Sequence, residues 1–305
     1  MPLLYFFESI RTPWLDRVML ILTELGGETA FLAVALILFW CVDKRKAYYL
    51  MSVGFIGTVS SQFLKIACQI PRPWVKDPGF TIVEAAREGA GGYSFPSGHS
   101  QTAVGTFGAL AMTAKKKWGK LAAVGVCFLV PLTRMYLGVH TPQDVLVGGA
   151  ISLVLLFGLK GIVFDHEGKH LPKLFAALVA LSVAYVGYIE LFPFPADIDP
   201  HNLASAQKNA YTLLGTITAM AAVYWADETR LHFSTEGTLK TQILKILGGI
   251  VAVLLIKEGL RAPLDALFGG HLIARSVRYG LIVLFSGILW PMSFPAISRL
   301  GRKES

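Results

Sequence analysis

Long apolar segments recur along almost the whole chain, separated by short turns that carry charge. A helix needs about 20 apolar residues to cross the hydrocarbon core of a bilayer. The sequence predicts nine such spans: 26–42, 47–67, 98–114, 120–138, 143–163, 171–191, 205–225, 240–260 and 278–296. Charged residues make up only 16% of the chain, against roughly 25% in a soluble domain. We therefore expect an all-α, polytopic transmembrane protein.

The first 25 residues do not fit this pattern. Residues 3–24 carry charged side chains among apolar ones, which is typical of an amphipathic helix at the membrane interface. We divide the chain into an interfacial segment, 1–25, a membrane core of six helices, 26–192, and a C-terminal extension of about three further helices, 193–305. The sequence assigns neither a role to the extension nor an oligomeric state to the protein.

The net charge of +8 raises the question of a nucleic-acid partner. A nucleic-acid-binding protein needs a basic face on a soluble fold, whereas these basic residues lie in short loops between apolar segments. With alternating spans, the loops rich in Lys and Arg share one face: 43–46, 114–120, 160–173, 226–240 and the tail 298–305. Cytoplasmic loops carry such positive charge. We therefore expect a membrane partner and no nucleic acid, with residues 68–97, 133–142 and 192–204 on the outer face.

One basic group fits this topology poorly, because it surrounds an outer-face loop. It consists of Lys257, Arg261, Arg275 and Arg278. The side chains can hold anionic lipid headgroups or a second phosphate. They can also extend to the interface or pair with Glu258 or Asp265, which is the interpretation we favour from sequence. A third alternative is that the last two spans are misplaced.

Three polar clusters interrupt the apolar chain, and all of them map to the outer face. They are Lys65 with Arg72-Pro73, then Pro96-Ser97-Gly98-His99, and then Thr133-Arg134 with His140 and Asp144. Cations can hold the oxygens of a phosphate, and histidines can act as nucleophile or as acid and base. Phosphoryl transfer needs this combination of groups.

Two of the clusters also read as helix starts. Ser97 precedes an apolar helix whose first N–H groups would point to the outer face, and such an end is a natural phosphate site. Thr141 and Pro142 suit the cap and first position of the following span. We therefore expect two helix N-termini to converge on one anion.

The spacings resemble those of the type-2 phosphatidic acid phosphatase superfamily, which also includes glucose-6-phosphatase-like enzymes and vanadium haloperoxidases. Its pattern is Lys-x6-Arg-Pro, Pro-Ser-Gly-His and Ser-Arg-x5-His-x3-Asp. The first two motifs are complete here, and Thr133 replaces Ser in the third. The motifs lie within residues 65–144, and the resemblance in hydrophobic layout covers about residues 1–190.

The resemblance implies a role for each motif residue. His140 would be the nucleophile, Asp144 would orient it, and His99 would protonate the leaving oxygen and then activate water. The phosphate would be bound by five further residues: Lys65, Arg72, Ser97, Gly98 and Arg134. The resemblance also implies catalysis without metal or other cofactor.

Single residues have simpler interpretations. Lys65 could extend to the interface, Arg72 could be an ordinary loop cation, and His140 could be an interfacial histidine. The segment 74–95 is either a lid or substrate-recognition loop or an inert connection. These separate interpretations do not account for all the motif residues occurring together, in the family's spacing and on one predicted face. We therefore favour a phosphate site.

The sequence thus predicts a membrane phosphatase that acts at the extracytoplasmic face through a phosphohistidine. Its substrate would be a lipid phosphate, such as phosphatidic acid or phosphatidylglycerol phosphate, or a polyprenyl diphosphate such as undecaprenyl diphosphate. Three alternatives stay open: a glucose-6-phosphatase-like sugar phosphatase, a lipid-to-acceptor phosphotransferase, and a non-catalytic lipid binder or transporter. The first residues lack the order of a cleavable signal peptide, and we expect a bacterial inner membrane.

Overall fold

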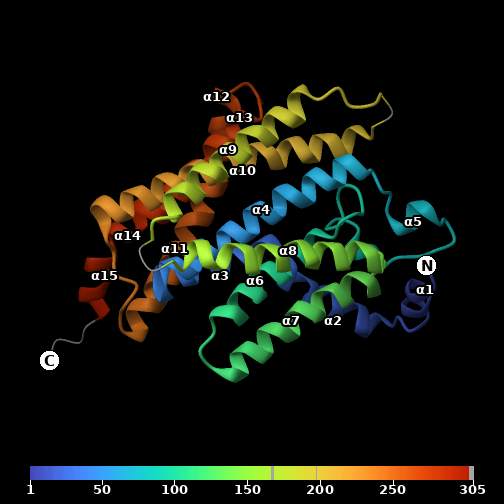
Figure 1. Ribbon diagram of the computed structural model, residues 1–305, viewed down its shortest axis with the longest axis horizontal. Coiled ribbons are helices and arrows are strands. Elements are labelled where there is room, and N and C mark those ends of the chain that lie inside the picture. Colours follow the sequence, from blue (N-terminus) through green and yellow to red (C-terminus); the bar gives the residue numbers. More distant parts are fainter. Residues whose placement is uncertain (166–167, 197, 302–305) are drawn as a thin grey trace. The chain divides into compact units, whose positions relative to one another are not determined.

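The computed structural model describes residues 1–165, 168–196 and 198–301, and these residues form helices and connecting turns without any strand (Figure 1). The predicted all-α fold is confirmed. Along the chain the helices are α1 (Pro2–Ser9), α2 (Pro13–Thr23), η1 (Glu24–Gly26), α3 (Glu28–Ile37), η2 (Leu38–Val42), α4 (Lys44–Cys68), α5 (Pro73–Lys76), η3 (Glu84–Ala86), α6 (Gly98–Thr113), α7 (Lys117–Tyr136), α8 (Pro142–Val163), α9 (Leu171–Leu191), α10 (Pro200–Ala226), η4 (Asp227–Leu231), α11 (Leu239–Gly259), α12 (Arg261–Leu267), α13 (Ile273–Leu284), η5 (Phe285–Leu289), α14 (Trp290–Met292) and α15 (Phe294–Gly301).

The chain is an integral membrane protein. Within the described ranges, 5 helical segments are long and apolar enough to cross a membrane: α4 continued to Lys76, α7, α8, α9, and residues 273–292. A sixth span exists if 13–26 and 28–42, which meet at a bend of 48°, form one broken span. The predicted spans at α6, α10 and α11 also form helices, although they do not meet this length and hydropathy criterion.

The N-terminal segment contains two helices where one amphipathic helix was expected. The side chain of Thr12 accepts a hydrogen bond from the backbone N–H of Leu15, and Pro13 occupies the first helical position. This capping pattern starts α2 as a new helix, separate from α1, which ends at Ser9. The interfacial location of residues 1–25 stays a prediction.

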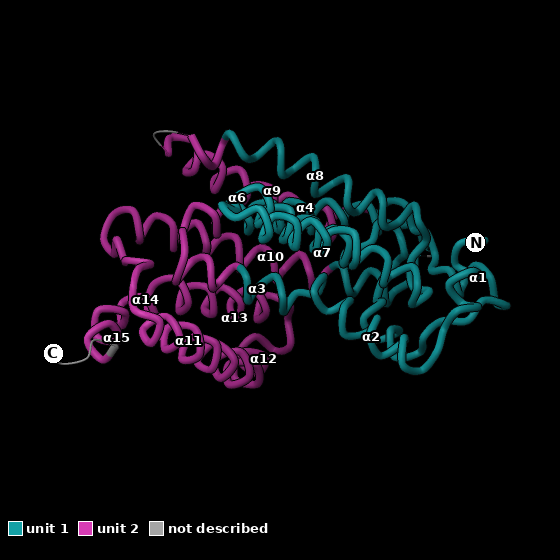
Figure 2. Tube along the Cα trace, turned by 90° about the horizontal axis from the view of Figure 1, so that it is seen from below, with its two compact units in different colours: residues 1–34, 49–161, 193–206 teal, residues 35–48, 162–192, 207–305 magenta. Residues whose placement is uncertain are grey.

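The chain forms two compact units, coloured separately in Figure 2. Unit 1 comprises residues 1–34, 49–161 and 193–206, and unit 2 comprises residues 35–48, 162–192 and 207–305. All the residues predicted to act on phosphate belong to unit 1. The division at residues 25 and 192 stays a prediction.

Close helix packing fixes the site end of unit 1. Helices α6 and α7 pack against each other, joined by the short turn at residues 114–116 (Figure 1). A side chain at Gly148 would lie 2.5 Å from the carbonyl oxygen of Ser97, and one at Gly26 would lie 2.8 Å from that of His99. These glycines allow α8 and η1 to approach the start of α6.

An apolar cluster supports the last turn of α7 from the N-terminal side. Its buried members are Phe7, Ala86, Ala90, Tyr136, Leu137 and Val139. The side chain of Arg11 reinforces it by donating to the carbonyl oxygen of Tyr136 at 3.1 Å and to that of Thr81 at 2.8 Å. The residue after this cluster is His140, so its backbone is held on firm packing.

Unit 2 is organised around aromatic side chains and two lysines. Tyr48, Phe175 and Tyr224 are in mutual ring contact. Lys44 pairs with the buried carboxylate of Asp227 at 2.6 Å. Lys245 is fully buried and donates to the carbonyl oxygens of Ser234 and Glu236, which ties the loop before α11 to that helix.

Candidate active site

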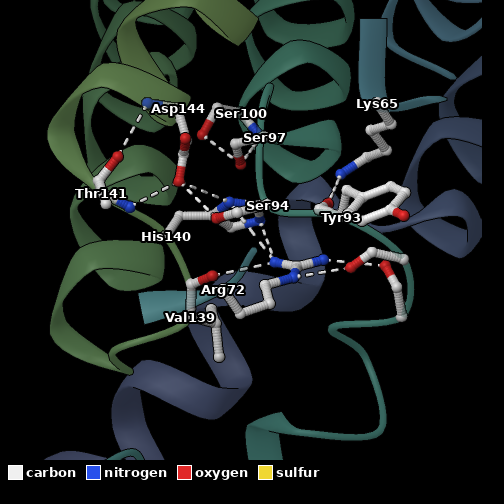
Figure 3. A network of polar contacts seen from close by, with 12 residues as sticks. Lys65, Arg72, Tyr93, Ser94, Ser97, Ser100, Val139, His140, Thr141 and Asp144 are labelled. Carbon is white, nitrogen blue, oxygen red and sulfur yellow. Dashed lines mark hydrogen bonds and ion pairs between the residues drawn. The ribbon is translucent and has the colours of Figure 1, made fainter. Parts of the chain in front are cut away.

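His140 lies between a guanidinium and a carboxylate (Figure 3). Its Nε2 atom is 2.9 Å from Nη1 of Arg72, and its Nδ1 atom is 3.5 Å from Oδ2 of Asp144. Both His140 and Asp144 are only 2% exposed. His140 and Asp144 therefore lie within ion-pair distance, and Nη1 of Arg72 approaches both ring nitrogens, at 2.9 Å from Nε2 and 3.5 Å from Nδ1.

The partners of His140 define the location of its proton. A guanidinium has only donors, so Nε2 accepts from Arg72 and carries the lone pair, while Nδ1 carries the proton towards Asp144. Burial, reinforced by the charges of Arg72, Arg134 and Lys65, holds the pKa of His140 well below its ordinary value of 6.5. The imidazole is therefore neutral, which is the charge state that a nucleophile requires, and its Nε2 lone pair is held by the Arg72 N–H.

Ser94 and Thr141 hold Asp144 by hydrogen bonds. Its Oδ2 atom accepts from the hydroxyl of Ser94 at 2.6 Å and from the backbone N–H of Thr141 at 2.8 Å. The Thr141 hydroxyl accepts in return from the backbone N–H of Asp144 at 3.3 Å. This reciprocal pattern starts α8 at Pro142, as the sequence predicted.

Backbone carbonyl groups hold Lys65 and Arg72. The ammonium of Lys65 donates to the carbonyl oxygen of Tyr93. Arg72 donates from Nη2 to Gly91 at 2.8 Å, from Nε to Gly92 at 3.0 Å and from Nη1 to the carbonyl oxygen of Val139 at 2.9 Å. The end of the 74–95 segment therefore forms part of the site.

Arg134 has buried donors that are not used within the described residues. It is 1% exposed, and Nη1 donates to the hydroxyl of Thr23 at 3.0 Å. Its Nε and Nη2 atoms are buried and have no hydrogen-bond partner within the described parts of the chain. A buried guanidinium without acceptors is unfavourable unless an anion completes it.

The start of α6 completes the arrangement. The Ser97 hydroxyl accepts from the backbone N–H of Ser100 at 3.3 Å, and the Ser97 N–H donates to the carbonyl oxygen of Asp144 at 2.9 Å. The N–H groups of Gly98 and His99 open this helix and have no partner within it. The starts of α6 and α8 are thus joined directly, as the predicted convergence requires.

The remaining motif side chains share this electrostatic environment. His99 interacts with the charges of Arg134, Arg72 and Lys65, and Lys65 also interacts with Asp144. No hydrogen bond from the His99 side chain is present among the described residues. The structure therefore brings all eight predicted residues to one end of unit 1, with His99 and Arg134 bonded less directly than the rest.

Burial bears on the simpler interpretations of single residues. Lys65 is 7% exposed and Arg72 is 6% exposed, so neither extends into solvent. His140 is buried rather than interfacial. The hydroxyl of Thr133 donates to the carbonyl oxygen of Val130 at 2.7 Å within its own helix, which explains why the exchange of Ser for Thr leaves the arrangement intact.

Sequence reasoning missed the groups that support the motif residues. Ser94 contacts Asp144, Thr23 contacts Arg134, and the carbonyl groups of residues 91–93 hold two cations. Ser94 stands two residues before Pro96, and that nearness to a motif was the one available signal. Among the described residues, no three His, Cys, Asp or Glu side chains are grouped as metal ligands. Catalysis without metal stays a prediction.

Helical spans and a buried, cation-rich site around a histidine define a membrane enzyme of phosphate chemistry. The model of the PAP2 superfamily matches residues 45–167, and that of the PAP2 superfamily phosphatase transmembrane extension matches residues 211–303. The chain belongs to the PAP2 superfamily and is a phosphatase, which confirms the resemblance inferred from the motifs.

Three relatives are named as phosphatases. Phosphatidylglycerophosphatase B of Bacillus subtilis (strain 168) is 30% identical over 172 residues, which are 52% of this chain and 80% of the relative. Undecaprenyl-diphosphatase of Sulfolobus acidocaldarius is 27% identical over 145 residues, 47% of this chain and 68% of the relative. A probable sphingosine-1-phosphate phosphatase of Dictyostelium discoideum is 24% identical over 220 residues, 64% of this chain and 52% of the relative. No solved structure matches the chain significantly.

Proposed function

We propose that the protein hydrolyses a lipid phosphate monoester or a polyprenyl diphosphate through a phosphohistidine on His140. The observation that carries this proposal is the buried imidazole of His140, with Nε2 at 2.9 Å from Arg72 and Nδ1 at 3.5 Å from the carboxylate of Asp144. A neutral, oriented histidine beside buried cations suits attack on an anionic phosphorus centre.

In the first step, the Arg72 N–H turns from Nε2 of His140 to an oxygen of the bound phosphate. The freed Nε2 lone pair forms a bond to phosphorus while the bond from phosphorus to the leaving oxygen breaks. Asp144 stabilises the positive charge that develops on the imidazole. Arg134, with Nε and Nη2 unpartnered, and the N–H groups at the start of α6 bind the non-bridging oxygens. The bound phosphate offsets the repulsion from the cations, so His99 holds a proton there and gives it to the leaving oxygen.

In the second step, water attacks the phosphohistidine. His99, now neutral, takes a proton from the water, the new oxygen–phosphorus bond forms, and the bond to Nε2 breaks. Inorganic phosphate leaves, and His140 and His99 return to their starting states.

The membrane and the relatives favour a lipid substrate. The chain is an integral membrane protein, and its relatives are named for phosphatidylglycerophosphate and undecaprenyl diphosphate as substrates. We therefore place lipid phosphates and polyprenyl diphosphates before soluble sugar phosphates. Its membership among phosphatases argues against the alternative of a non-catalytic lipid binder.

The charge pattern favours an extracytoplasmic site in a bacterial inner membrane. Helix α6 runs from the site to the turn that carries Lys115, Lys116 and Lys117, and its 16 residues span about 24 Å. Positive loops stay in the cytoplasm, so the other end of α6 and α7 would face outward.

A single experiment tests nucleophile and substrate class. The purified protein and its His140→Ala variant are assayed for phosphate release from phosphatidylglycerol phosphate, phosphatidic acid, undecaprenyl diphosphate and glucose 6-phosphate. We expect a loss of at least about a thousandfold in the variant, inhibition of the native enzyme by vanadate and no effect of chelators. Hydrolysis that persists in His140→Ala would remove the phosphohistidine mechanism.

The same panel separates the alternatives. Faster turnover of glucose 6-phosphate than of any lipid would replace the lipid assignment with a sugar phosphatase. A phosphorylated acceptor lipid formed in place of free phosphate would identify a phosphotransferase.

A further inference from the structure

Two arginines in the C-terminal extension stand near one aromatic ring. The guanidinium carbon of Arg275 lies 5.6 Å from the ring centroid of Tyr279, and that of Arg278 lies 5.4 Å from it. All three belong to α13, inside a segment that is apolar enough to span the membrane. Arginine in such a segment is costly and marks a functional position by default.

Arg278 lacks the partners that a buried guanidinium requires. It is 8% exposed, and its Nε atom is buried without a hydrogen-bond partner in the described ranges. Arg275 is half-buried and uses Nε to donate to the hydroxyl of Thr212 at 3.2 Å. The two guanidinium groups therefore keep most of their donors for another acceptor.

No carboxylate of the described residues forms an ion pair with Arg275 or Arg278. The sequence favoured either extension to the interface or ion pairs with Glu258 or Asp265. Those ion pairs are absent from the described residues, and both acids are exposed. Glu190 interacts with the hydroxyl of Tyr211. Two cations without a counter-ion on one turn of a span imply an anionic ligand.

The backbone around the arginines is held rigidly. The hydroxyl of Ser276 donates to the carbonyl oxygen of Tyr211 at 2.5 Å, and a Cβ at Gly215 would overlap the carbonyl of Ser276. Helix α13 therefore has a fixed rotation against α10, and its arginines have fixed directions. Lys257 and Arg261 are exposed, so they are not part of this fixed pair.

We infer that Arg275 and Arg278 form a second phosphate-binding site in unit 2, separate in its residues from the catalytic histidines. Arginine binds phosphate oxygens bidentately, and Tyr279 restricts both side chains by cation–π contact. The ligand is a phosphate group, carried by a lipid headgroup or by a soluble phosphate. This inference stands whether or not His140 is the nucleophile.

Native mass spectrometry of the full-length protein in neutral detergent tests the site. The probes are phosphatidylglycerol, diacylglycerol as the lipid without phosphate, and inorganic phosphate. We expect Arg278→Gln and Arg275→Gln to bind phosphatidylglycerol on the order of tenfold or more weakly than the native chain. Arg261→Gln removes an exposed charge from the same region and should bind like the native chain. Diacylglycerol should not bind at the site.

Additional variants and measurements identify the ligand and control for misfolding. Arg134→Gln should bind phosphatidylglycerol like the native chain, whereas Arg278→Gln should not. This difference would distinguish the second site from the candidate active site. Without phosphate, Arg278→Gln should melt no lower than the native chain, because it removes an unpaired buried charge. Binding of inorganic phosphate in place of phosphatidylglycerol, lost in the same variants, would identify a soluble ligand. Equal binding of both probes by the native chain, Arg275→Gln and Arg278→Gln would overturn the inference.

Discussion

At the scale of single residues, the two arginines of the candidate site differ in how many of their N–H donors lack a hydrogen-bond acceptor. Arg72 uses its donors on the carbonyl groups of Gly91, Gly92 and Val139 and on His140. Arg134 keeps Nε and Nη2 without acceptors. We therefore expect Arg72 to hold His140 and the backbone of Gly91 and Gly92, and Arg134 to make the larger direct contact with phosphate.

Ser94 offers a test of how Asp144 is oriented. Its hydroxyl donates to Oδ2 at 2.6 Å without contacting His140, so Ser94→Ala should loosen the carboxylate and misdirect Nδ1. We expect kcat to fall by about tenfold, which corresponds to ~1.4 kcal/mol, with KM almost unchanged. Ser94→Thr should restore most of kcat.

The matched control for this variant is Ser52→Ala. The Ser52 hydroxyl is equally buried but has no hydrogen-bond partner in the described chain, so its removal should leave kcat unchanged. A rise in KM at constant kcat in Ser94→Ala would contradict a positioning role.

The buried state of His140 predicts how stability depends on pH. Its pKa is well below 6.5 in the folded protein, whereas an unfolded histidine titrates near 6.5. Below that pH the unfolded state binds a proton that the folded state does not, so stability falls as pH falls. Between pH 7.5 and 5.5 the loss is about 1.4 kcal/mol.

This contribution is absent in His140→Gln. Melting curves in detergent at pH 7.5 and 5.5 should therefore show a steeper decrease for the native protein than for the variant. Equal decreases would mean that the imidazole binds its proton in the folded state.

At the scale of helices, hydropathy and start signals predicted much of what the structure contains. All nine predicted spans are helical, although 26–42 and 278–296 are each divided over more than one helical element, and the caps at Ser97 and Thr141 are present. Hydropathy did not predict the break at Thr12, because apolar residues lie on both sides of it. It also could not predict the contacts of Ser94 or Thr23, because these depend on which helices meet in space.

Gly148 tests the junction of α6 and α8. A Cβ there would lie 2.5 Å from the carbonyl oxygen of Ser97, and a backbone carbonyl cannot rotate away as a side chain can. Gly148→Ala should therefore separate the two helix starts, with a loss of about 1–3 kcal/mol of stability and a clear fall in kcat. Gly149→Ala is the neighbouring control, since its Cβ would meet Val104 at an ordinary 3.5 Å. Equal effects of the two substitutions on melting temperature and rate would show that the junction does not depend on this approach.

At the scale of the whole molecule, orientation in the membrane decides which compartment receives the phosphate. The turn at Lys115–Lys117 and the site lie at opposite ends of α6 and α7. Three adjacent lysines favour the cytoplasm strongly, whereas the segment before α6 carries acidic residues such as Glu84 and Glu88. The charge asymmetry therefore predicts an outward site.

Thiol labelling in intact cells tests this orientation. In a chain whose three cysteines, Cys41, Cys68 and Cys127, are replaced by serine, single cysteines are introduced as Glu88→Cys and Lys116→Cys, both at exposed positions. A membrane-impermeant maleimide should label Glu88→Cys in intact bacteria and Lys116→Cys only after permeabilisation. The reverse pattern would put the site in the cytoplasm, where it would act on lipid phosphates of the inner leaflet while its chemistry stayed the same.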